Sequence, residues 1–264
     1  MLRVNRISKV FNQGTVNEKQ ALKEINLHLY KGDFVTVIGS NGAGKSTLMN
    51  AVAGVYPVDS GSISVDGEEV TRLNESQRAK YIGRVFQDPM AGTAPTMTIE
   101  ENLAMAYKRG KKRALRTALN KNLKDYFRTS LESLELNLEN RLQNKVGLLS
   151  GGERQALSLL MATFTQPKIL LLDEHTAALD PKRAKLITHL TEKIVHQDHL
   201  TTLMITHNME QALKLGNRLI MMHQGEIVLE LNELQKAKMT TSDLIHAFEE
   251  LKGEKFVDDR IALG

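Results

Sequence analysis

The chain of 264 residues contains no cysteine, which excludes disulfide bonds and metal sites built from thiolates. It also has no apolar run that approaches the ~20 residues a helix needs to cross a bilayer. The first residues, Met-Leu-Arg-Val-Asn-Arg, lack the apolar stretch of a secretory signal. From these absences we expect an intracellular protein without a membrane span of its own.

What is present is an ordinary globular composition, with 41% hydrophobic and 25% charged residues. The length suits one large domain, or one domain with a subdomain. The net charge of +4 is mild, and one basic cluster, Lys108–Arg113 with Arg116, stands out. Because no aromatic residues interleave with it for base stacking, we interpret this cluster as a solvated helix start and expect no nucleic-acid partner.

A phosphate-binding pattern lies near the N-terminus, where residues 39–46 match G-x-x-x-x-G-K-[ST] without a mismatch. The glycines let backbone N–H groups turn toward phosphates, Lys45 supplies a charge for the β- and γ-phosphates, and Ser46 a hydroxyl for Mg²⁺. Phe34–Ile38 reads as a buried strand and Ser46–Ala53 as a helix, whose positive end would face the phosphates. The sequence therefore predicts a nucleoside-triphosphate site. Its predicted residues are Gly39, Ser40, Asn41, Gly42, Ala43, Gly44, Lys45, Ser46 and Thr47.

Strand-like runs alternate with helical patterns along much of the chain, which predicts an α/β fold with a mostly parallel sheet. Ile169–Leu172 is apolar on both faces, as a central parallel strand should be. A hairpin is expected at Gln224-Gly225. The expected strands are Ile25–Tyr30, Phe34–Ile38, Ile82–Phe86, Ile169–Asp173, Thr201–Thr206, Arg218–His223 and Glu226–Leu229.

The middle of the chain differs, since residues 88–166 show helical signals and no convincing strand. Thr98 and Glu101 have the spacing of a capping box, and an amphipathic stretch runs from about Lys112 to Leu134. We expect a helical subdomain over about 88–166, inserted into a core of residues 1–87 and 167–230. The remaining residues, 231–264, are expected to form a short tail with one helix, Thr241–Glu250.

Two carboxylates follow the apolar strand Ile169–Leu172. An aspartate at this edge of a sheet, beside the phosphate loop, typically holds Mg²⁺, which makes Asp173 a predicted ligand. An adjacent glutamate can polarise an attacking water, which makes Glu174 the predicted catalytic base. Apolar strands often end in acidic residues, so this interpretation depends on the phosphate loop.

A second anion site is indicated at Leu149–Gln155, which reads Leu-Ser-Gly-Gly-Glu-Arg-Gln. Ser150 and Glu153 have capping-box spacing, so a helix is expected to begin there, and Gly151 and Gly152 expose N–H groups at its start. A plain capped helix is one interpretation. The other is that this helix end serves the nucleotide of another molecule, because the phosphate loop already binds its own.

Together these motifs resemble those of the ATP-binding subunits of ABC transporters, from about Leu2 to Leu229. The resemblance implies a RecA-like P-loop NTPase core with an antiparallel β subdomain. It also implies that Ser150, Gly151, Gly152 and Glu153 belong to the signature motif, which contacts the γ-phosphate held by a partner subunit. Four further roles follow from the resemblance. They are Gln87 as the Q-loop glutamine that senses Mg²⁺, Asp180 as the D-loop aspartate, His207 as the switch histidine and Phe11 as the aromatic that stacks on adenine.

The sequence departs from this family at His175, where the family commonly has proline. An imidazole beside Glu174 has two interpretations: it tunes the basicity of the glutamate, or it points into solvent. We favour the solvent-facing position. Residues 160–162 also lack the arginine often seen after the signature helix, but neither change removes a catalytic group.

The resemblance implies an Mg²⁺-dependent ATPase that works as a head-to-tail homodimer, because the family's geometry does not bring the phosphate loop and the signature motif together within one subunit. A two-fold axis makes the contact between two copies self-complementary and closes it at a dimer. Each ATP would lie between Gly39–Thr47 of one copy and Ser150–Glu153 of the other. The transport pathway would belong to a separate integral-membrane permease, served by an extracytoplasmic solute-binding receptor, with this chain peripheral on the cytoplasmic face. A free-standing subunit favours an importer, and details such as residues 173–180 are similar to a group associated with amino acids, including aromatic ones.

Other classes of protein fit less well. A soluble ABC-type ATPase acting on DNA or ribosomes usually has two cassettes or a long coiled-coil insertion, and this chain has neither. A GTPase would need N-K-x-D, but Asn144–Gly147 stops short of the aspartate. A small-molecule kinase has no need of Leu149–Gln155, and a Rossmann dehydrogenase would need a third glycine after Gly44.

Overall fold

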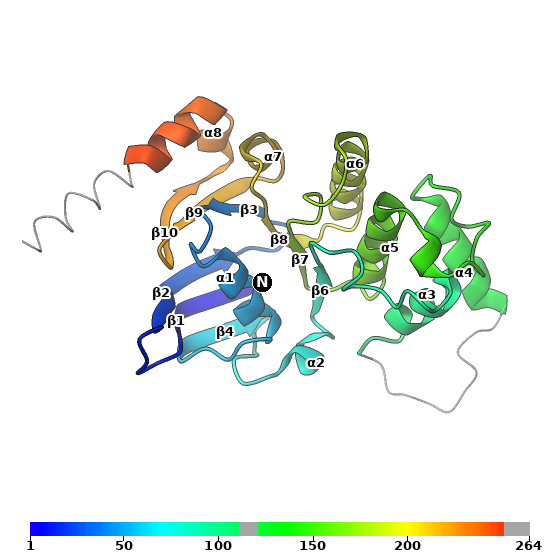
Figure 1. The fold of residues 1–264 in the computed structure, drawn as a ribbon, viewed down its shortest axis with the longest axis horizontal. Coiled ribbons are helices and arrows are strands. Elements are labelled where there is room, and N and C mark those ends of the chain that lie inside the picture. The colour runs from blue at the N-terminus through cyan, green and yellow to red at the C-terminus, as the bar shows by residue number, and fades with distance from the viewer. Residues whose placement is uncertain (111–120, 251–264) are drawn as a thin grey trace, which may run out of the picture.

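The computed structural model describes residues 1–110 and 121–250. They form a six-stranded and a four-stranded sheet, with helices packed around them (Figure 1). This arrangement confirms the expected fold class, an α/β core with a mostly parallel sheet, an antiparallel β portion and helical elements.

The six-stranded sheet is mostly parallel. Its strands, in spatial order, are β10 (Glu226–Leu231), β9 (Arg218–His223), β3 (Phe34–Gly39), β8 (Thr201–Ile205), β7 (Ile169–Asp173) and β6 (Ile82–Val85). β3 runs parallel to β8 and β9, β7 runs parallel to β6 and β8, and only β10 is antiparallel to its neighbour. β3, β7 and β8 are buried almost throughout, which explains their continuous apolar runs.

The four-stranded sheet is antiparallel. In spatial order it contains β2 (Lys19–Leu29), β1 (Leu2–Phe11), β4 (Ser60–Val65) and β5 (Glu68–Glu69). The sequence predicts only the second part of β2 and misses the other three strands. β1 was missed because its register shifts against both neighbours, which breaks the regular alternation of apolar residues that marks a strand, and β5 has only two residues. At the end of this ladder, Phe11 lies opposite Lys19.

The helices pack in three groups around these sheets. Their bounds are α1 (Lys45–Ala53), α2 (Glu75–Arg78), α3 (Ile99–Tyr107), α4 (Lys121–Glu132), the 3-10 helix η1 (Val146–Leu148), α5 (Gly151–Thr163), α6 (Pro181–Gln197), α7 (Met209–Lys214) and α8 (Glu233–Lys236). One core joins the helices α3 to α6 to β7, and a second lies around α1 between the two sheets. A third joins α7 and the C-terminal segment to β9. Figure 1 shows α3, α4 and α5 at the end of the molecule opposite β1 and β2.

The described part of residues 88–166 contains helices and no strand beyond one isolated bridge, between Thr98 and Lys145. The capping box at Thr98 is confirmed: its hydroxyl oxygen accepts the N–H of Glu101 at 3.2 Å, and the Glu101 carboxylate accepts the N–H of Thr98 at 2.7 Å. The amphipathic stretch is described only from residue 121, as α4. Most of the basic cluster lies at residues 111–116, outside the described residues.

The predicted bounds of β7 and β9 agree with the structure at both ends. Other strands differ by a few residues, most of all β2, which begins at Lys19 and not at Ile25. The helix expected at Thr241–Glu250 is present, since residues 241–250 are helical, and the described residues beyond β10 add the short helix α8, which was not predicted. Among the described residues, none of the helices has both the length and the apolar character required to cross a bilayer.

Candidate functional site

The loop of residues 39–47 joins β3 to α1 and needs glycine at two positions. Gly39 has a φ of 147°, and a Cβ there would lie 2.2 Å from the carbonyl oxygen of Met222. Gly44 has a φ of 101°, and a Cβ there would lie 2.5 Å from the carbonyl oxygen of Ala21. No side chain caps the N-terminus of α1, so its first backbone N–H groups are left for an anion.

Lys45 lies at the base of this loop and is only 5% exposed. Its ammonium group donates hydrogen bonds to the carbonyl oxygens of Gly39 at 2.8 Å and Ser40 at 3.0 Å. Burial lowers the pKa of Lys45 below its ordinary value, while the carboxylates of Glu174 and Asp173 act in the opposite direction. The ammonium is thus held by backbone carbonyl dipoles, and it feels the charges of Asp173, the last residue of β7, and of Glu174, the next residue.

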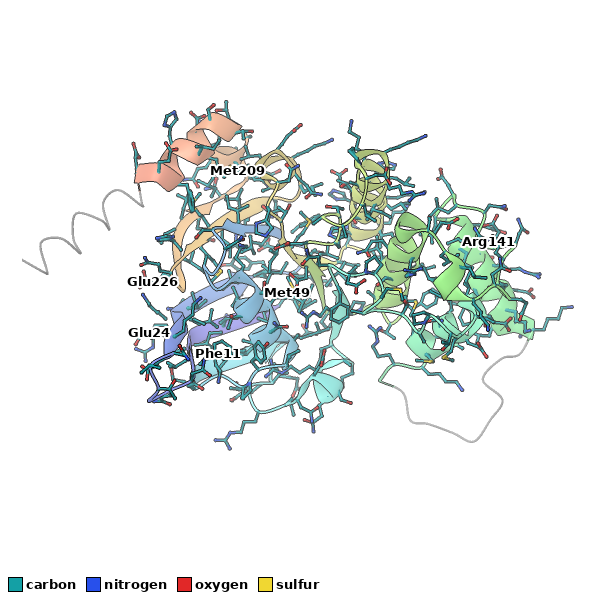
Figure 2. All side chains as sticks on the ribbon, in the orientation of Figure 1. Phe11, Glu24, Met49, Arg141, Met209 and Glu226 are labelled. Atoms are coloured by element: carbon teal, nitrogen blue, oxygen red, sulfur yellow. The ribbon has the colours of Figure 1, made fainter. Side chains whose placement is uncertain are left out.

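A cavity of about 300 Å³ opens beside this loop. Its lining comes from the β1–β2 hairpin, the loop and α1, and the ends of β7 and β8. The lining residues are Phe11, Lys19, Ala21, Asn41, Gly42, Ala43, Gly44, Lys45, Ser46, Thr47, Glu174 and His207. Figure 2 shows Phe11 on the antiparallel sheet, on the side of α1. The fold therefore brings Phe11, Glu174 and His207 to the glycine-rich loop, although they are far apart in sequence.

Two lining residues, Lys19 and Ala21, are absent from the sequence-based prediction. Lys19 pairs with Phe11 across the β1–β2 ladder, and its Nζ lies 3.3 Å from where a Cβ on Gly42 would be. A second cation therefore lies over the glycine-rich loop. No motif marks Lys19 in the sequence, because only the pairing of β1 with β2 places it here.

Glu174 and His207 contact each other directly. The Nε2 atom of His207 lies 2.5 Å from Oε1 of Glu174, and the Glu174 side chain is only 12% exposed. They meet because β7 and β8 are parallel neighbours, so the residues after both strands emerge at the same edge of the sheet. The backbone N–H of Glu174 also donates to the carbonyl oxygen of Ile205 at 3.1 Å, which joins the two strand ends.

Asp173 and Gln87 do not line the cavity. The Oδ2 atom of Asp173 lies 3.3 Å from Nη2 of Arg84, whose guanidinium lies 4.6 Å from the centre of the Phe86 ring. Gln87 is exposed, just beyond β6. The hydroxyl of Ser46 and the carboxylate of Asp173 are oxygen donors of the kind that Mg²⁺ prefers. Together with the Lys45 ammonium, these oxygen donors fit a triphosphate accompanied by a hard divalent cation.

The signature residues cap α5 away from this cavity. The Ser150 hydroxyl oxygen accepts the N–H of Glu153 at 3.4 Å, and the Glu153 carboxylate accepts the N–H of Ser150 at 2.8 Å, which confirms the capping box. Burial raises the pKa of Glu153, but hydrogen bonds from Ser150 and Arg141 outweigh it and hold the pKa below its ordinary value. Figure 2 shows Arg141 at the end of the molecule opposite Phe11. Residues 150–153 do not belong to the cavity lining of their own chain.

Asp180 begins α6. Its side chain accepts a hydrogen bond from the backbone N–H of Arg183 at 3.2 Å, and Pro181 occupies the first helical position. Asp180 is exposed and lies outside the cavity lining. Its contacts in the single chain are this cap and an ion pair with Arg183, whose Nε lies 3.4 Å from Oδ2 of Asp180.

The expectation that His175 points into solvent is wrong. His175 is only 2% exposed, and its Nε2 lies 2.9 Å from the Thr191 hydroxyl oxygen. The Thr191 hydroxyl donates to the carbonyl oxygen of Ile187 at 2.8 Å, so the histidine Nε2–H is the donor between the two side chains. Burial lowers the pKa of His175 to about 4, so the ring is neutral near pH 7. The turn after Glu174 directs this side chain inward, which the sequence pattern does not reveal.

Comparison with known proteins gives consistent matches. The family described as ABC transporter matches residues 22–177. The tyrosine transport ATP-binding protein of Clostridioides difficile is 43% identical over 249 residues, which cover 94% of this chain and 99% of that protein. The methionine import ATP-binding protein MetN of Aliivibrio fischeri is 34% identical over 232 residues, which cover 86% of this chain and 64% of that protein. This chain therefore spans a little less than two thirds of the methionine relative.

Among solved structures, a dimeric post-hydrolysis state of the ATP-binding cassette MJ0796, bound to ADP and Pi, is similar to this chain. The TM-score is 0.75 and the sequence identity 28%, over 88% of this chain and 99% of that one.

Proposed function

The chain belongs to the ABC transporter family, as an ATP-binding and ATP-hydrolysing subunit, and from that premise we propose that two copies close head to tail around two ATP molecules and drive a separate permease. One observation carries the proposal. The cavity collects the phosphate loop, Glu174 and His207, yet the second anion-seeking helix end, at Ser150, lies outside it in the same chain. A second copy supplies that helix end if the contact is symmetric.

ATP binding is assigned to the cavity residues. Phe11 stacks on the adenine, while the free N–H groups at the start of α1 and the charge of Lys45 hold the phosphates. Ser46, Asp173 and Gln87 are the residues that would hold Mg²⁺. When bound, Mg²⁺ neutralises part of the charge that develops on the phosphoryl oxygens. Lys45 is already desolvated by the loop, so it exchanges carbonyl partners for phosphate oxygens without first losing a shell of water.

Hydrolysis is assigned to Glu174 and His207. Glu174 orients a water molecule and accepts its proton as the water oxygen bonds to the γ-phosphorus, and the bond from this phosphorus to the ADP oxygen breaks. His207 holds the carboxylate, since its Nε2 already lies 2.5 Å from Glu174. The low exposure of the glutamate favours this role, because electrostatic interactions are stronger where water is excluded.

The second copy completes each site. The N–H groups at the start of α5, at Ser150–Glu153, approach the γ-phosphate held by the partner, and Asp180 lies at the same interface. Phosphate charge between these donors holds the dimer closed, and loss of the γ-phosphate weakens that attraction. A shift from mostly open to mostly closed needs ~5 kcal/mol of differential binding, which two shared nucleotides can supply.

The permease is proposed to dock in a groove between the core and the helical segment. This groove is lined by residues that include Arg78, Ile82, Arg84 and Phe86 from the core and Arg109 from the turn after α3. It suits a short cytoplasmic helix of an integral-membrane partner, with the chain peripheral on the inner face of the membrane. Arg84 lines this groove and contacts Asp173 at the end of β7. A partner that binds in the groove and moves Arg84 therefore also changes the surroundings of Asp173.

The proposed cargo is an amino acid, imported with the help of an extracytoplasmic solute-binding receptor. The name of the Clostridioides difficile relative, tyrosine transport ATP-binding protein, supports an aromatic amino acid, because that relative is aligned over nearly its whole length. The methionine relative supports the broader class. Cargo selectivity resides in the receptor and permease, so the test must recover them.

The catalytic assignment is tested by Glu174→Gln, which keeps the shape of the side chain and removes the base. With ATP and Mg²⁺ this variant should bind nucleotide, hydrolyse it at least about a hundredfold more slowly and accumulate as a dimer in gel filtration. Glu210→Gln, at an exposed site on α7, serves as the control. A Glu174→Gln protein that stays monomeric with normal turnover would remove Glu174 from this role.

The partner and cargo are tested by purifying the affinity-tagged chain from its own cells under mild detergent. We expect a membrane permease and a solute-binding receptor, and we expect the receptor to bind an aromatic amino acid in calorimetry. Recovery of ribosomes or DNA in place of a permease would favour the soluble ABC-type ATPase.

A further inference from the structure

Glu174 and His207 lie in two separate loops. Two other side chains, those of His175 and Gln211, hydrogen-bond these loops to one face of α6. Gln211 lies in α7, four residues after His207, and His175 directly follows Glu174. Their partners are two threonines of α6, at positions 188 and 191. Since these positions are three residues apart in a helix, their side chains share a face.

The Gln211 amide joins three parts of the chain. Its Oε1 accepts a hydrogen bond from the Thr206 hydroxyl at 2.7 Å, at the end of β8. Its Nε2 donates to the Thr188 hydroxyl oxygen at 3.0 Å, on α6, and to the Thr176 hydroxyl oxygen at 3.4 Å, in the loop after β7. One side chain therefore ties the His207 loop both to α6 and to the loop of Glu174.

The directions of these hydrogen bonds require an amide at position 211. The Thr188 hydroxyl donates its proton to the carbonyl oxygen of Ala184 at 2.8 Å, so its oxygen can only accept from Gln211. The Thr206 oxygen accepts the N–H of Asn208 at 3.1 Å, while its own proton goes to Gln211. A glutamate at 211 has no N–H for Thr188 and is therefore a poor replacement.

The hydrogen bond between His175 and Thr191 has the same arrangement: the threonine donates to the helix backbone and accepts from the loop side chain. The Thr191 hydroxyl donates to the carbonyl oxygen of Ile187, and its lone pair accepts the Nε2–H of His175. Both side chains of this tie are at least 98% buried, so water does not compete for the contact. Both threonines of α6 thus give their protons to the helix backbone and offer lone pairs to the two loops.

We propose that α6 is the common anchor of the Glu174–His207 pair, and that Gln211 and His175 are positioning residues for ATP hydrolysis. The proposal rests on the catalytic assignment made above. The pair comes from two separate loops, and Glu174 has a φ of 45°, a conformation that non-glycine residues keep only when their surroundings hold it. A catalytic group displaced by about 1 Å loses about a hundredfold in rate, so supports of this kind act on turnover.

The test measures kcat and KM for ATP with the full chain. Gln211→Ala, Gln211→Glu, Thr188→Val and Thr191→Val should each lower kcat about tenfold or more, with KM within about twofold of the original. Thr188→Ser and Thr191→Ser keep the hydroxyl and should restore kcat. Glu210→Gln, next to Gln211 but exposed, should leave both constants unchanged. Thermal unfolding of each variant checks that the protein compared is folded.

A double-mutant cycle separates this proposal from the catalytic assignment. In a Glu174→Gln background, Gln211→Ala should cause no further loss of the residual kcat, because the group that it positions is gone. The proposal is overturned if the valine variants keep the original kcat, if they change only KM, or if the losses multiply in full in the cycle. If Glu174→Gln itself keeps normal turnover, the catalytic assignment fails first, and the positioning role fails with it.

Discussion

At the scale of the residue, the cavity holds two lysines in different settings. Lys45 is buried and bonded to loop carbonyls, while Lys19 is exposed and reaches over the same loop from β2. A buried charge that changes partners during the reaction affects both binding and turnover. An exposed charge at the rim contributes mainly to binding, and its contribution falls as salt is added.

We therefore expect Lys19→Ala to raise KM for ATP about two- to fivefold while kcat changes less than about twofold. Added salt should reduce the difference, because an exposed charge is screened. Lys23→Ala is the matched control, since Lys23 lies on the same strand, pairs with Glu226 and does not line the cavity. The measurement is KM and kcat for ATP in steady-state ATPase assays at two ionic strengths. An unchanged KM for Lys19→Ala would exclude a contact between Lys19 and the nucleotide.

The burial of His175 predicts how the free energy of unfolding changes with pH. Its pKa is about 4 when folded and 6.5 ordinarily, so between these values the unfolded chain binds a proton that the folded chain does not. The stabilisation is complete above about pH 6.5 and is lost as the pH falls toward 4, by ~3 kcal/mol from this group. His175→Asn should flatten this part of the stability curve in denaturant titrations. His189→Asn, at an exposed position of α6, should leave the slope unchanged, and equal slopes for both variants would contradict the assignment.

The residues of the cavity show what a sequence can predict. The glycine-rich loop is a contiguous pattern whose chemistry is local, so Lys45 and Ser46 are predictable from the sequence alone. Phe11 and His207 depend on the family resemblance, because their approach to the loop requires strand pairing. Lys19 carries no signal of either kind, and the inward turn of His175 depends on the backbone after Glu174.

At the scale of the element, two capping boxes begin helices in different places. Ser150 caps α5 at the proposed dimer interface, and Thr98 caps α3 within the helical segment. Replacing either cap with alanine removes one side-chain acceptor from the first turn of a helix. Such a loss costs about 1 kcal/mol of folding stability.

Ser150→Ala and Thr98→Ala should therefore lower stability by similar amounts, about 1 kcal/mol each in denaturant unfolding. Only Ser150→Ala should also lower turnover at saturating ATP and weaken ATP-dependent dimerisation, because only its helix end is proposed to contact a phosphate. Equal effects of the two variants on turnover would mean that α5 is a plain capped helix.

The elements were predictable where the signal is local. β7 is apolar on both faces, and the capping boxes at Thr98 and Ser150 show in a few residues each. The resemblance implies an antiparallel β subdomain, but the positions of β1, β4 and β5 escaped prediction; β1 changes register against β2 three times. α8 is a single turn, too short to give a periodic pattern.

At the scale of the whole molecule, the two phosphate-seeking helix ends lie apart. The N-terminus of α1 faces the cavity, whereas the N-terminus of α5 belongs to the helical end of the molecule (Figure 1). A rigid single copy cannot use both on one nucleotide. Two copies related by a two-fold axis can, and each then depends on the other for both sites.

Mixing two inactive variants tests this dependence directly. Lys45→Ala disables the phosphate loop and Ser150→Arg blocks the signature end, so each variant alone should be inactive. In a mixed dimer both defects fall on one site, and the other site is intact, so turnover should appear on mixing. With random pairing about half of the dimers are mixed, so about a quarter of all sites are intact. The measurement is the ATPase rate of the mixture against the sum of the separate rates. Turnover above that sum is the expected result, and turnover no greater than the sum would show that each chain completes its own site.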